Sequence, residues 1–161
     1  RESYWASVTI DRSTNPLKLD FNYQNEITPA LDAVIALTNN LIQGEAVDPD
    51  RIYIMGLSMG GMGTLEAVHR FPKLFAAAVA ICGGGDVATY NKKVKRIPFW
   101  LFHGDDDNVV AVGHSRQRVA RLKELKVDVQ YTEYPGVNHG SWTNAFAEPE
   151  LLPWLFSKKK K

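Results

Sequence analysis

The sequence predicts an α/β fold, a mainly parallel β-sheet with helices on both faces. The first observation is that four short apolar runs alternate with longer segments whose apolar residues recur at helical spacing. The second is that these runs are almost continuously apolar, which is typical of parallel strands covered on both faces. The third is a glycine-rich turn, residues 56–61, that joins one such run directly to a helical segment. With 161 residues, the chain has the length of one domain.

Local signals place the elements along the chain. Residues 1–27 mix aromatic and polar side chains without a period, so we expect an irregular leading segment in the single domain formed by residues 1–161. Thr28 and Pro29 are typical of a helix N-cap and first helical position, and we expect this amphipathic helix to end near Gly44. The strands are predicted at 52–55, 75–82, 97–102 and 127–134, and the later helices at 61–70, 115–126 and 144–156.

Composition and charge argue against several classes of function. The net charge is +1, and the only basic run, residues 158–161, reads as a solvated tail, so the sequence indicates neither a nucleic-acid nor a membrane partner. Cys82 is the only cysteine, which excludes an intrachain disulfide, and its apolar surroundings predict a buried small hydrophobe. Histidines and acids lack metal-ligand spacing such as His-x-x-x-His, so we expect no metal, and the chemistry inferred below needs no cofactor.

The glycine-rich turn carries the pattern Gly-x-Ser-x-Gly in Gly56, Ser58 and Gly60. A strand that enters a helix through one tight turn forces the serine into a strained conformation, and we expect glycine on both sides because larger side chains would clash. The turn would place the Ser58 hydroxyl near the helix N-terminus, where the Met59 backbone N–H helps to hold a developing oxyanion. The pattern predicts a nucleophile, and the alternative is a serine in a turn without chemistry.

Two further groups follow the ends of later predicted strands. The acidic cluster at residues 105–107 follows one, and His139, in the loop 136–140, follows another. Functional side chains of parallel sheets gather at the carboxyl ends of the strands, so we expect these groups to meet Ser58. His139 would take the serine proton, and a carboxylate would orient the imidazole. The other histidines read as solvated or packing residues, with His103 a weaker rival as the base: His69, His103 and His114.

Spacing alone leaves the choice of aspartate open. We favour Asp107 because it lies farther into the loop, where its side chain has room to turn back toward His139. Asp105 is better placed to cap the turn directly after the strand, and Asp106 is the third alternative.

Four motifs in this order resemble those of α/β-hydrolase carboxylesterases. The motifs are Gly56-Leu-Ser-Met-Gly-Gly61, Cys82-Gly-Gly-Gly-Asp86, Phe102-His-Gly-Asp-Asp-Asp107 and Glu133-Tyr-Pro-Gly-Val-Asn-His139-Gly-Ser-Trp142. They are most similar to the branch that holds polyhydroxybutyrate-depolymerase-like, feruloyl and acetylxylan esterases and dienelactone hydrolase. The resemblance implies an α/β-hydrolase fold and allows a secreted or cell-envelope location. It matches the family's nucleophile, acid, base and second oxyanion donor to Ser58, Asp107, His139 and Met59.

The chain also departs from this family. Its members carry several strands before the nucleophile and a His-Gly-rich loop that donates the other oxyanion N–H, whereas the 57 residues before Ser58 contain no such motif. We therefore expect that N-terminal strands are missing and that the strand at 52–55 has a bare apolar edge. A missing N-terminal segment or a second copy of the chain is predicted to cover that edge. Loss of one oxyanion donor lowers kcat by about 10²–10³.

Two functions from different classes are compatible with these residues. One is a serine carboxylesterase, with a serine peptidase as a lesser variant, acting on a small-molecule or polysaccharide-linked ester. The other is a non-catalytic or fragmentary chain that acts in binding or assembly. Trp142, beside the histidine loop, and the methionines of the turn, Met59 and Met62, are candidates to line an acyl site or to pack in the core.

Overall fold

A four-stranded parallel sheet forms the centre of the computed structural model, which describes residues 4–160. The strand order is β3-β4-β5-β6, with all three neighbouring pairs parallel. Their bounds are Tyr53–Leu57 for β3, Ala77–Ile81 for β4, Phe99–Gly104 for β5 and Val129–Tyr134 for β6. Strands β4 and β6 lie inside their predicted ranges, and β3 and β5 end two residues later than predicted. The predicted parallel sheet is therefore confirmed.

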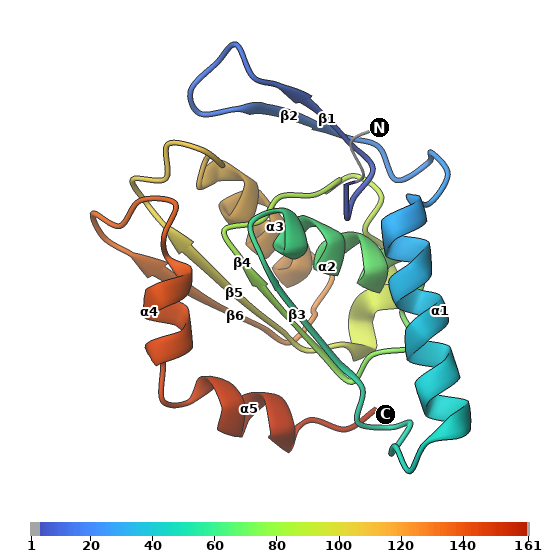
Figure 1. Ribbon diagram of the computed structural model, residues 1–161. Coiled ribbons are helices and arrows are strands. Elements are labelled where there is room, and N and C mark those ends of the chain that lie inside the picture. Colours follow the sequence, from blue (N-terminus) through green and yellow to red (C-terminus); the bar gives the residue numbers. More distant parts are fainter. Residues whose placement is uncertain (1–3, 161) are drawn as a thin grey trace.

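Helices cover both faces of this sheet, as the sequence predicted (Figure 1). One face packs against α1 (Pro29–Gly44), α2 (Met59–Arg70) and α3 (Gly113–Glu124). The other packs against α4 (Trp142–Ala147) and α5 (Leu151–Ser157), and a 3₁₀ helix, η1 (Lys92–Arg96), precedes β5. Alternate residues of β4 point into the two cores: Ala78 and Ala80 into the first, and Ala77, Val79 and Ile81 into the second.

The leading segment differs from the prediction, because it contains an antiparallel hairpin instead of irregular chain. Strands β1 (Val8–Asp11) and β2 (Lys18–Phe21) pair with each other and lie apart from the central sheet (Figure 1). Only four residues form each strand, and half of the eight side chains are exposed, which leaves too short an apolar pattern for a sequence-based prediction.

Tertiary contacts hold the hairpin over the loops that follow β3 and β5. Leu19 packs with Met62 and Val110 in a small apolar cluster. At the base of the hairpin, the fully buried Glu66 of α2 accepts hydrogen bonds from the backbone N–H and the hydroxyl of Ser7, and Arg70 donates to the same carboxylate. The hairpin is therefore held by apolar contacts to Met62 of α2 and Val110 after β5, and its base by hydrogen bonds from Ser7 to Glu66 of α2.

The C-terminal region differs from the prediction in two places. The expected helix 144–156 is broken into α4 and α5, because Pro149 disfavours helical backbone at Glu148, which is extended. The basic tail is bound to the start of β3: the Tyr53 hydroxyl donates to the Lys158 carbonyl (2.7 Å), and the Lys160 N–H donates to the Asp50 carbonyl (2.9 Å).

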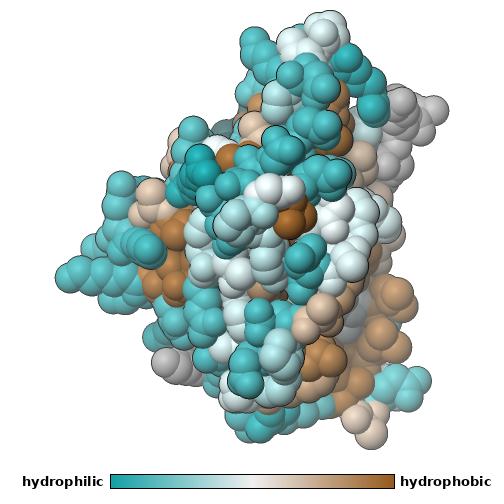
Figure 2. Space-filling model, turned by 90° about the vertical axis from the view of Figure 1, so that its left-hand side faces the viewer, coloured by the Kyte–Doolittle hydropathy of each residue, from teal (hydrophilic) through white to brown (hydrophobic). Residues whose placement is uncertain are grey.

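The surface is mostly hydrophilic when viewed from the left-hand side of Figure 1, with separate hydrophobic patches (Figure 2). Among residues 4–160, one of the large apolar side chains that solvent reaches is Met55 on the outer strand β3, with an exposed fraction of 39%. No helix in this part of the chain combines the length and apolarity needed to cross a membrane.

Candidate active site

Ser58 lies in the sharp turn between β3 and α2. Its backbone has φ 51° and ψ −117°, a strained conformation for a residue with a side chain. Two hydrogen bonds maintain it: the Ser58 N–H donates to the Ile81 carbonyl (2.8 Å), and the Met62 N–H donates to the Ser58 carbonyl (3.0 Å). The turn therefore ties β3, the end of β4 and the first turn of α2 together around one hydroxyl.

The glycines of this turn have unequal roles. A Cβ built on Gly56 would lie 2.2 Å from the Gly60 carbonyl oxygen, and one on Gly61 would lie 2.8 Å from the Ile81 carbonyl oxygen. A Cβ on Gly60 meets nothing within 4 Å. The expected clash on both sides of the serine is thus wrong for Gly60, because its Cβ would point into open space. Gly56 and Gly61 are the positions that allow strand and helix to approach.

Ser58, His139 and Asp107 form a continuous hydrogen-bonded row. The Ser58 Oγ lies 2.8 Å from the His139 Nε2, and the His139 Nδ1 lies 2.8 Å from the Asp107 Oδ2. The three residues follow the carboxyl ends of β3, β6 and β5. Asp107 is fully buried at its side chain, whereas the His139 side chain retains 17% exposure and Ser58 is half-buried. The row thus runs from a shielded carboxylate to a hydroxyl that solvent and ligands reach.

The Asp107 carboxylate accepts four hydrogen bonds. Oδ1 accepts from the backbone N–H groups of Val109 and Val110, both at 2.9 Å, and Oδ2 accepts from His139 and from the His103 Nε2 at 3.1 Å. Burial raises the pKa of Asp107, but the hydrogen bonds from the two histidines and the two amides outweigh it and hold the pKa well below its usual range. Asp107 is therefore ionised at neutral pH and able to stabilise a cation on His139.

The neighbouring acids lie outside this row. The Asp105 carboxylate accepts a hydrogen bond from the Gly136 N–H (2.6 Å) and so fixes the loop that carries His139. The sequence suggested instead that Asp105 caps the turn directly after its own strand, whereas its carboxylate bonds to the loop that follows β6. Asp106 has an exposed side chain, and its backbone N–H donates to the Val137 carbonyl (3.1 Å).

His103 contacts Asp107, which the sequence analysis did not predict. Its side chain is fully buried and lies between Asp107 and Ser115, whose Oγ is 2.7 Å from the His103 Nδ1. The spacing of four residues between His103 and Asp107, directly after a strand, is the signal that could have indicated this contact. By contrast, His69 stacks on Tyr90 and His114 packs edge-on against Phe21, both away from the serine.

The remaining predicted residues flank the row. Met59 is the first residue of α2 and directly follows Ser58, so its N–H belongs to the first turn of that helix. Trp142 begins α4, and its ring meets the His139 ring edge-on, with the centroids 5.4 Å apart and an interplanar angle of 89°. Trp142 therefore limits the movement of the imidazole on one side.

Cys82 also approaches the row. Its Sγ, a carboxylate oxygen of Asp107 and a ring nitrogen of His139 all lie within 4.8 Å of one another. These are metal-binding residue types, but the Asp107 and His139 atoms are hydrogen-bonded at 2.8 Å, closer than the separation of about 3.3 Å that two ligands keep around tetrahedral zinc. Burial raises the pKa of the Cys82 thiol to about 11, which keeps it protonated. The arrangement therefore fits proton transfer better than metal binding.

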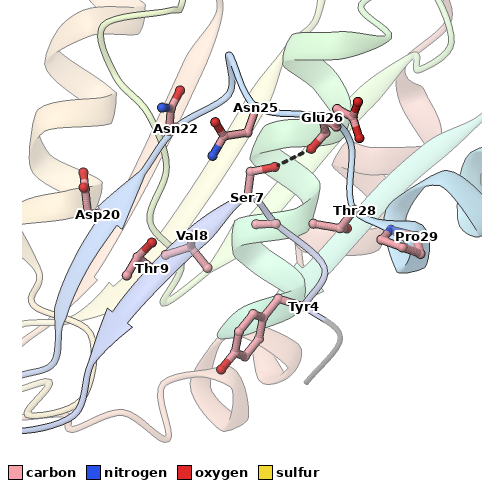
Figure 3. Close-up of a pocket in the computed structure, with 11 residues that line it drawn as sticks. Tyr4, Ser7, Val8, Thr9, Asp20, Asn22, Asn25, Glu26, Thr28 and Pro29 are labelled. Carbon is pink, nitrogen blue, oxygen red and sulfur yellow. Dashed lines mark hydrogen bonds between the residues drawn. The ribbon is translucent and has the colours of Figure 1, made fainter. Parts of the chain in front are cut away.

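Two hollows of the surface contain no residue of the row. One, of about 670 Å³, lies beside the hairpin and is lined mainly by polar residues; there the Ser7 Oγ lies 3.2 Å from the Glu26 carbonyl oxygen (Figure 3). The other, of about 200 Å³, lies between α1, α2 and β3 and reaches Gly60, two residues after Ser58. Its lining is mostly apolar and includes Trp5 and Met55, which are both exposed.

Comparisons with known proteins agree on one family. The model of the phospholipase/carboxylesterase family matches residues 15–149. The chain is 27% identical over 121 residues to Carboxylesterase SOBER1 of Arabidopsis thaliana, covering 72% of this chain and 53% of that protein. It is 29% identical over 149 residues to Acyl-protein thioesterase 1 of Neurospora crassa, covering 85% of this chain and 58% of that protein.

A solved structure is also similar in sequence. The crystal structure of a thermostable esterase is 45% identical and superimposes with a TM-score of 0.79, covering 81% of this chain and 37% of that chain. The chain thus spans about half the length of the curated relatives it matches, and a smaller share of this structure.

Proposed function

The chain belongs to the phospholipase/carboxylesterase family of α/β-hydrolases, and from this premise we propose that it is a serine carboxylesterase. One observation carries the proposal. The Ser58 hydroxyl, the His139 imidazole and the buried Asp107 carboxylate are joined by two contacts of 2.8 Å each. A serine hydroxyl is a poor nucleophile unless such a base lies within hydrogen-bond reach.

The proposed reaction begins when Ser58 attacks the ester carbonyl. The hydroxyl proton passes to the His139 Nε2, and the imidazolium is stabilised by the ionised Asp107 across the Nδ1 contact. The carbonyl oxygen becomes an oxyanion, and the Met59 N–H at the start of α2 donates to it. Collapse of this intermediate breaks the bond to the alcohol, which takes the proton from His139 and leaves an acyl group on Ser58.

Water then releases the acyl group. His139 accepts a proton from the water, the hydroxide attacks the acyl carbonyl, and the Ser58 oxygen leaves with that proton. The products are a carboxylic acid and the free enzyme. We propose a small-molecule or polysaccharide-linked ester as the substrate, with Trp142 beside the acyl group because its ring packs against His139.

The test is covalent labelling with a serine-directed phosphonate, followed by intact-mass measurement. We expect one adduct on the wild-type chain and none on Ser58→Ala. Ser13→Ala is the matched control, because Ser13 is exposed in the hairpin and bonds only to its neighbour Asp11 in the contacts of residues 4–160. Absence of labelling on the wild-type chain would favour the alternative, a non-catalytic chain that acts in binding or assembly. Efficient hydrolysis of a peptide amide, in addition to the matching ester, would indicate a peptidase instead.

We also propose that the outer edge of β3 binds another segment in the active protein. Within residues 4–160, β3 pairs only with β4, and the apolar hollow between α1, α2 and β3 opens beside this edge. Such edges are paired or covered in stable proteins. An N-terminal segment or a second copy of the chain would cover the edge and bring a second N–H donor close to Gly60.

A further inference from the structure

The residue of interest is His103, at the end of β5, which the reaction above does not use. Its ring is fully buried, and both of its nitrogens have partners. The Nε2 lies 3.1 Å from the Asp107 Oδ2 and 2.9 Å from the Val110 carbonyl oxygen. The Nδ1 lies 2.7 Å from the Ser115 Oγ. A buried polar group with this many contacts calls for a physical account.

The partners determine where the proton of His103 lies. Both groups that face Nε2 are acceptors, since one is a carboxylate and the other a carbonyl, so Nε2 must carry the hydrogen. The Ser115 hydroxyl is then free to donate to Nδ1. A neutral ring of this tautomer satisfies all three contacts, because the two acceptors at Nε2 select the tautomer and the Ser115 hydroxyl adapts to it.

This tautomer directs an N–H group at the oxygen that also accepts the hydrogen bond from the His139 Nδ1–H. Oδ2 of Asp107 accepts from both histidines, while Oδ1 is held by the two amides of Val109 and Val110. Rotation of the carboxylate about its bond to Cβ would break contacts at both oxygens. The row therefore extends from Ser115 through His103 and Asp107 to His139 and Ser58.

We propose that His103 is a positioning residue that holds the Asp107 carboxylate in the orientation required to align His139. This inference rests on the proposed function, because it concerns the same row of groups. It goes beyond that function in assigning a second histidine and Ser115 of α3 to the alignment of the base. The other titratable groups that act on this ring are His114 of α3 and Glu133, its register partner on β6.

Two matched substitutions of His103 separate positioning from packing. In His103→Gln, the side-chain amide reaches the place of Nε2 and keeps a donor for Asp107. In His103→Asn, the shorter amide reaches only the place of Nδ1, so it keeps the contact to Ser115 and loses the donor to Asp107. His69→Gln is the control, since His69 stacks on Tyr90 away from the row.

We expect His103→Asn to lower kcat by about 10-fold to 100-fold, the cost of a small misplacement of catalytic groups, with little change in KM. The acid limb of its pH–rate profile should move to higher pH, because loss of a donor raises the pKa of Asp107 and leaves more negative charge facing His139. His103→Gln should retain most of the activity and the wild-type profile. Equal loss in both variants, or no loss in His103→Asn, would overturn the proposal.

A second readout does not depend on catalysis. The proton between the His139 Nδ1 and the Asp107 Oδ2 should give a far-downfield proton NMR signal, which we expect to shift in His103→Asn and to persist in His103→Gln. A chain that shows these signals without esterase activity would contradict the proposed function and support the positioning role. Should His103→Asn fail to fold, Ser115→Ala tests the same row: we expect a smaller fall in kcat and the same direction of pH shift, and an unchanged profile would overturn the proposal.

Discussion

The acid of the row is distinguished from its neighbours by its hydrogen bonds. Asp107 is buried and accepts four of them, while Asp105 is exposed and accepts one from the Gly136 N–H. Only Asp107 touches the imidazole. The difference in role between these two residues, separated by one position in the chain, therefore follows from their contacts.

We predict that Asp107→Asn lowers kcat/KM far more than Asp105→Asn does. An asparagine at position 107 favours the wrong imidazole tautomer, which costs about 10⁴-fold in a serine protease. An asparagine at position 105 keeps an oxygen for the Gly136 N–H. Steady-state hydrolysis of a chromogenic ester measures both variants, and the reverse ranking would assign the acid to Asp105.

The sequence allowed part of the site to be predicted. Residue type, chain order and the ends of predicted strands brought Ser58, Asp107 and His139 to one place, and the structure has them in contact. It did not allow the second histidine at Asp107 to be recognised. The four-residue spacing of His103 and Asp107 is compatible with that contact, but the contact itself depends on the turn of the loop after β5 and on the approach of α3.

At the scale of elements, the junction of β3 and α2 determines where Ser58, the proposed nucleophile, lies. The strand and helix meet so closely that a Cβ on Gly56 would come within 2.2 Å of the Gly60 carbonyl oxygen. The atoms that a Cβ on Gly56 would meet belong to the backbone of Gly60 and Gly61, so they cannot move aside as the end of a flexible side chain could. A substitution at Gly56 must therefore shift the helix.

We predict that Gly56→Ala lowers the free energy of unfolding by about 1–3 kcal/mol, the usual range for overpacking, and displaces Ser58 from His139. Gly60→Ala is the matched control, because its Cβ meets nothing within 4 Å and alanine favours helix. Chemical denaturation and phosphonate labelling rate measure the two effects. Equal stability of the two variants would show that the turn relaxes around the added methyl group.

The helices and strands also show which sequence signals were sufficient to predict an element and which were not. Continuous apolar runs located all four strands of the sheet, and caps located α1 from Thr28 to Gly44. The hairpin was missed because its contacts, such as Ser7 with Glu66, join residues 59 positions apart. The break in the helix predicted at 144–156 was not located, because that segment contains two prolines and only Pro149 interrupts the helix, whereas Pro153 lies inside α5.

At the scale of the whole molecule, the outer edge of β3 has no strand paired to it within residues 4–160. Met55 is 39% exposed there and lines the apolar hollow with Trp5. The curated relatives are about twice as long as the part that this chain matches. Both observations support our proposal that another segment binds at this edge.

We predict that native mass spectrometry of the purified chain detects a complex, either a dimer or a heteromer with a second polypeptide. Met55→Lys should weaken the complex, because a charge on an exposed strand edge opposes pairing. Leu152→Lys, which places the same charge on the exposed surface of α5, should leave it intact. A stable monomer at all concentrations would show that the edge needs no partner.

The placement of the proposed catalytic row has a practical consequence for this edge. Ser58, Asp107 and His139 all come from one continuous stretch, and the segment expected at β3 would supply strand pairing and an oxyanion donor but none of the three. Ester turnover would then report occupancy of the edge without any change in the triad. Fusing the chain and a complementing segment to two interacting proteins would turn the pair into a split reporter, in which colour develops only when the two proteins meet.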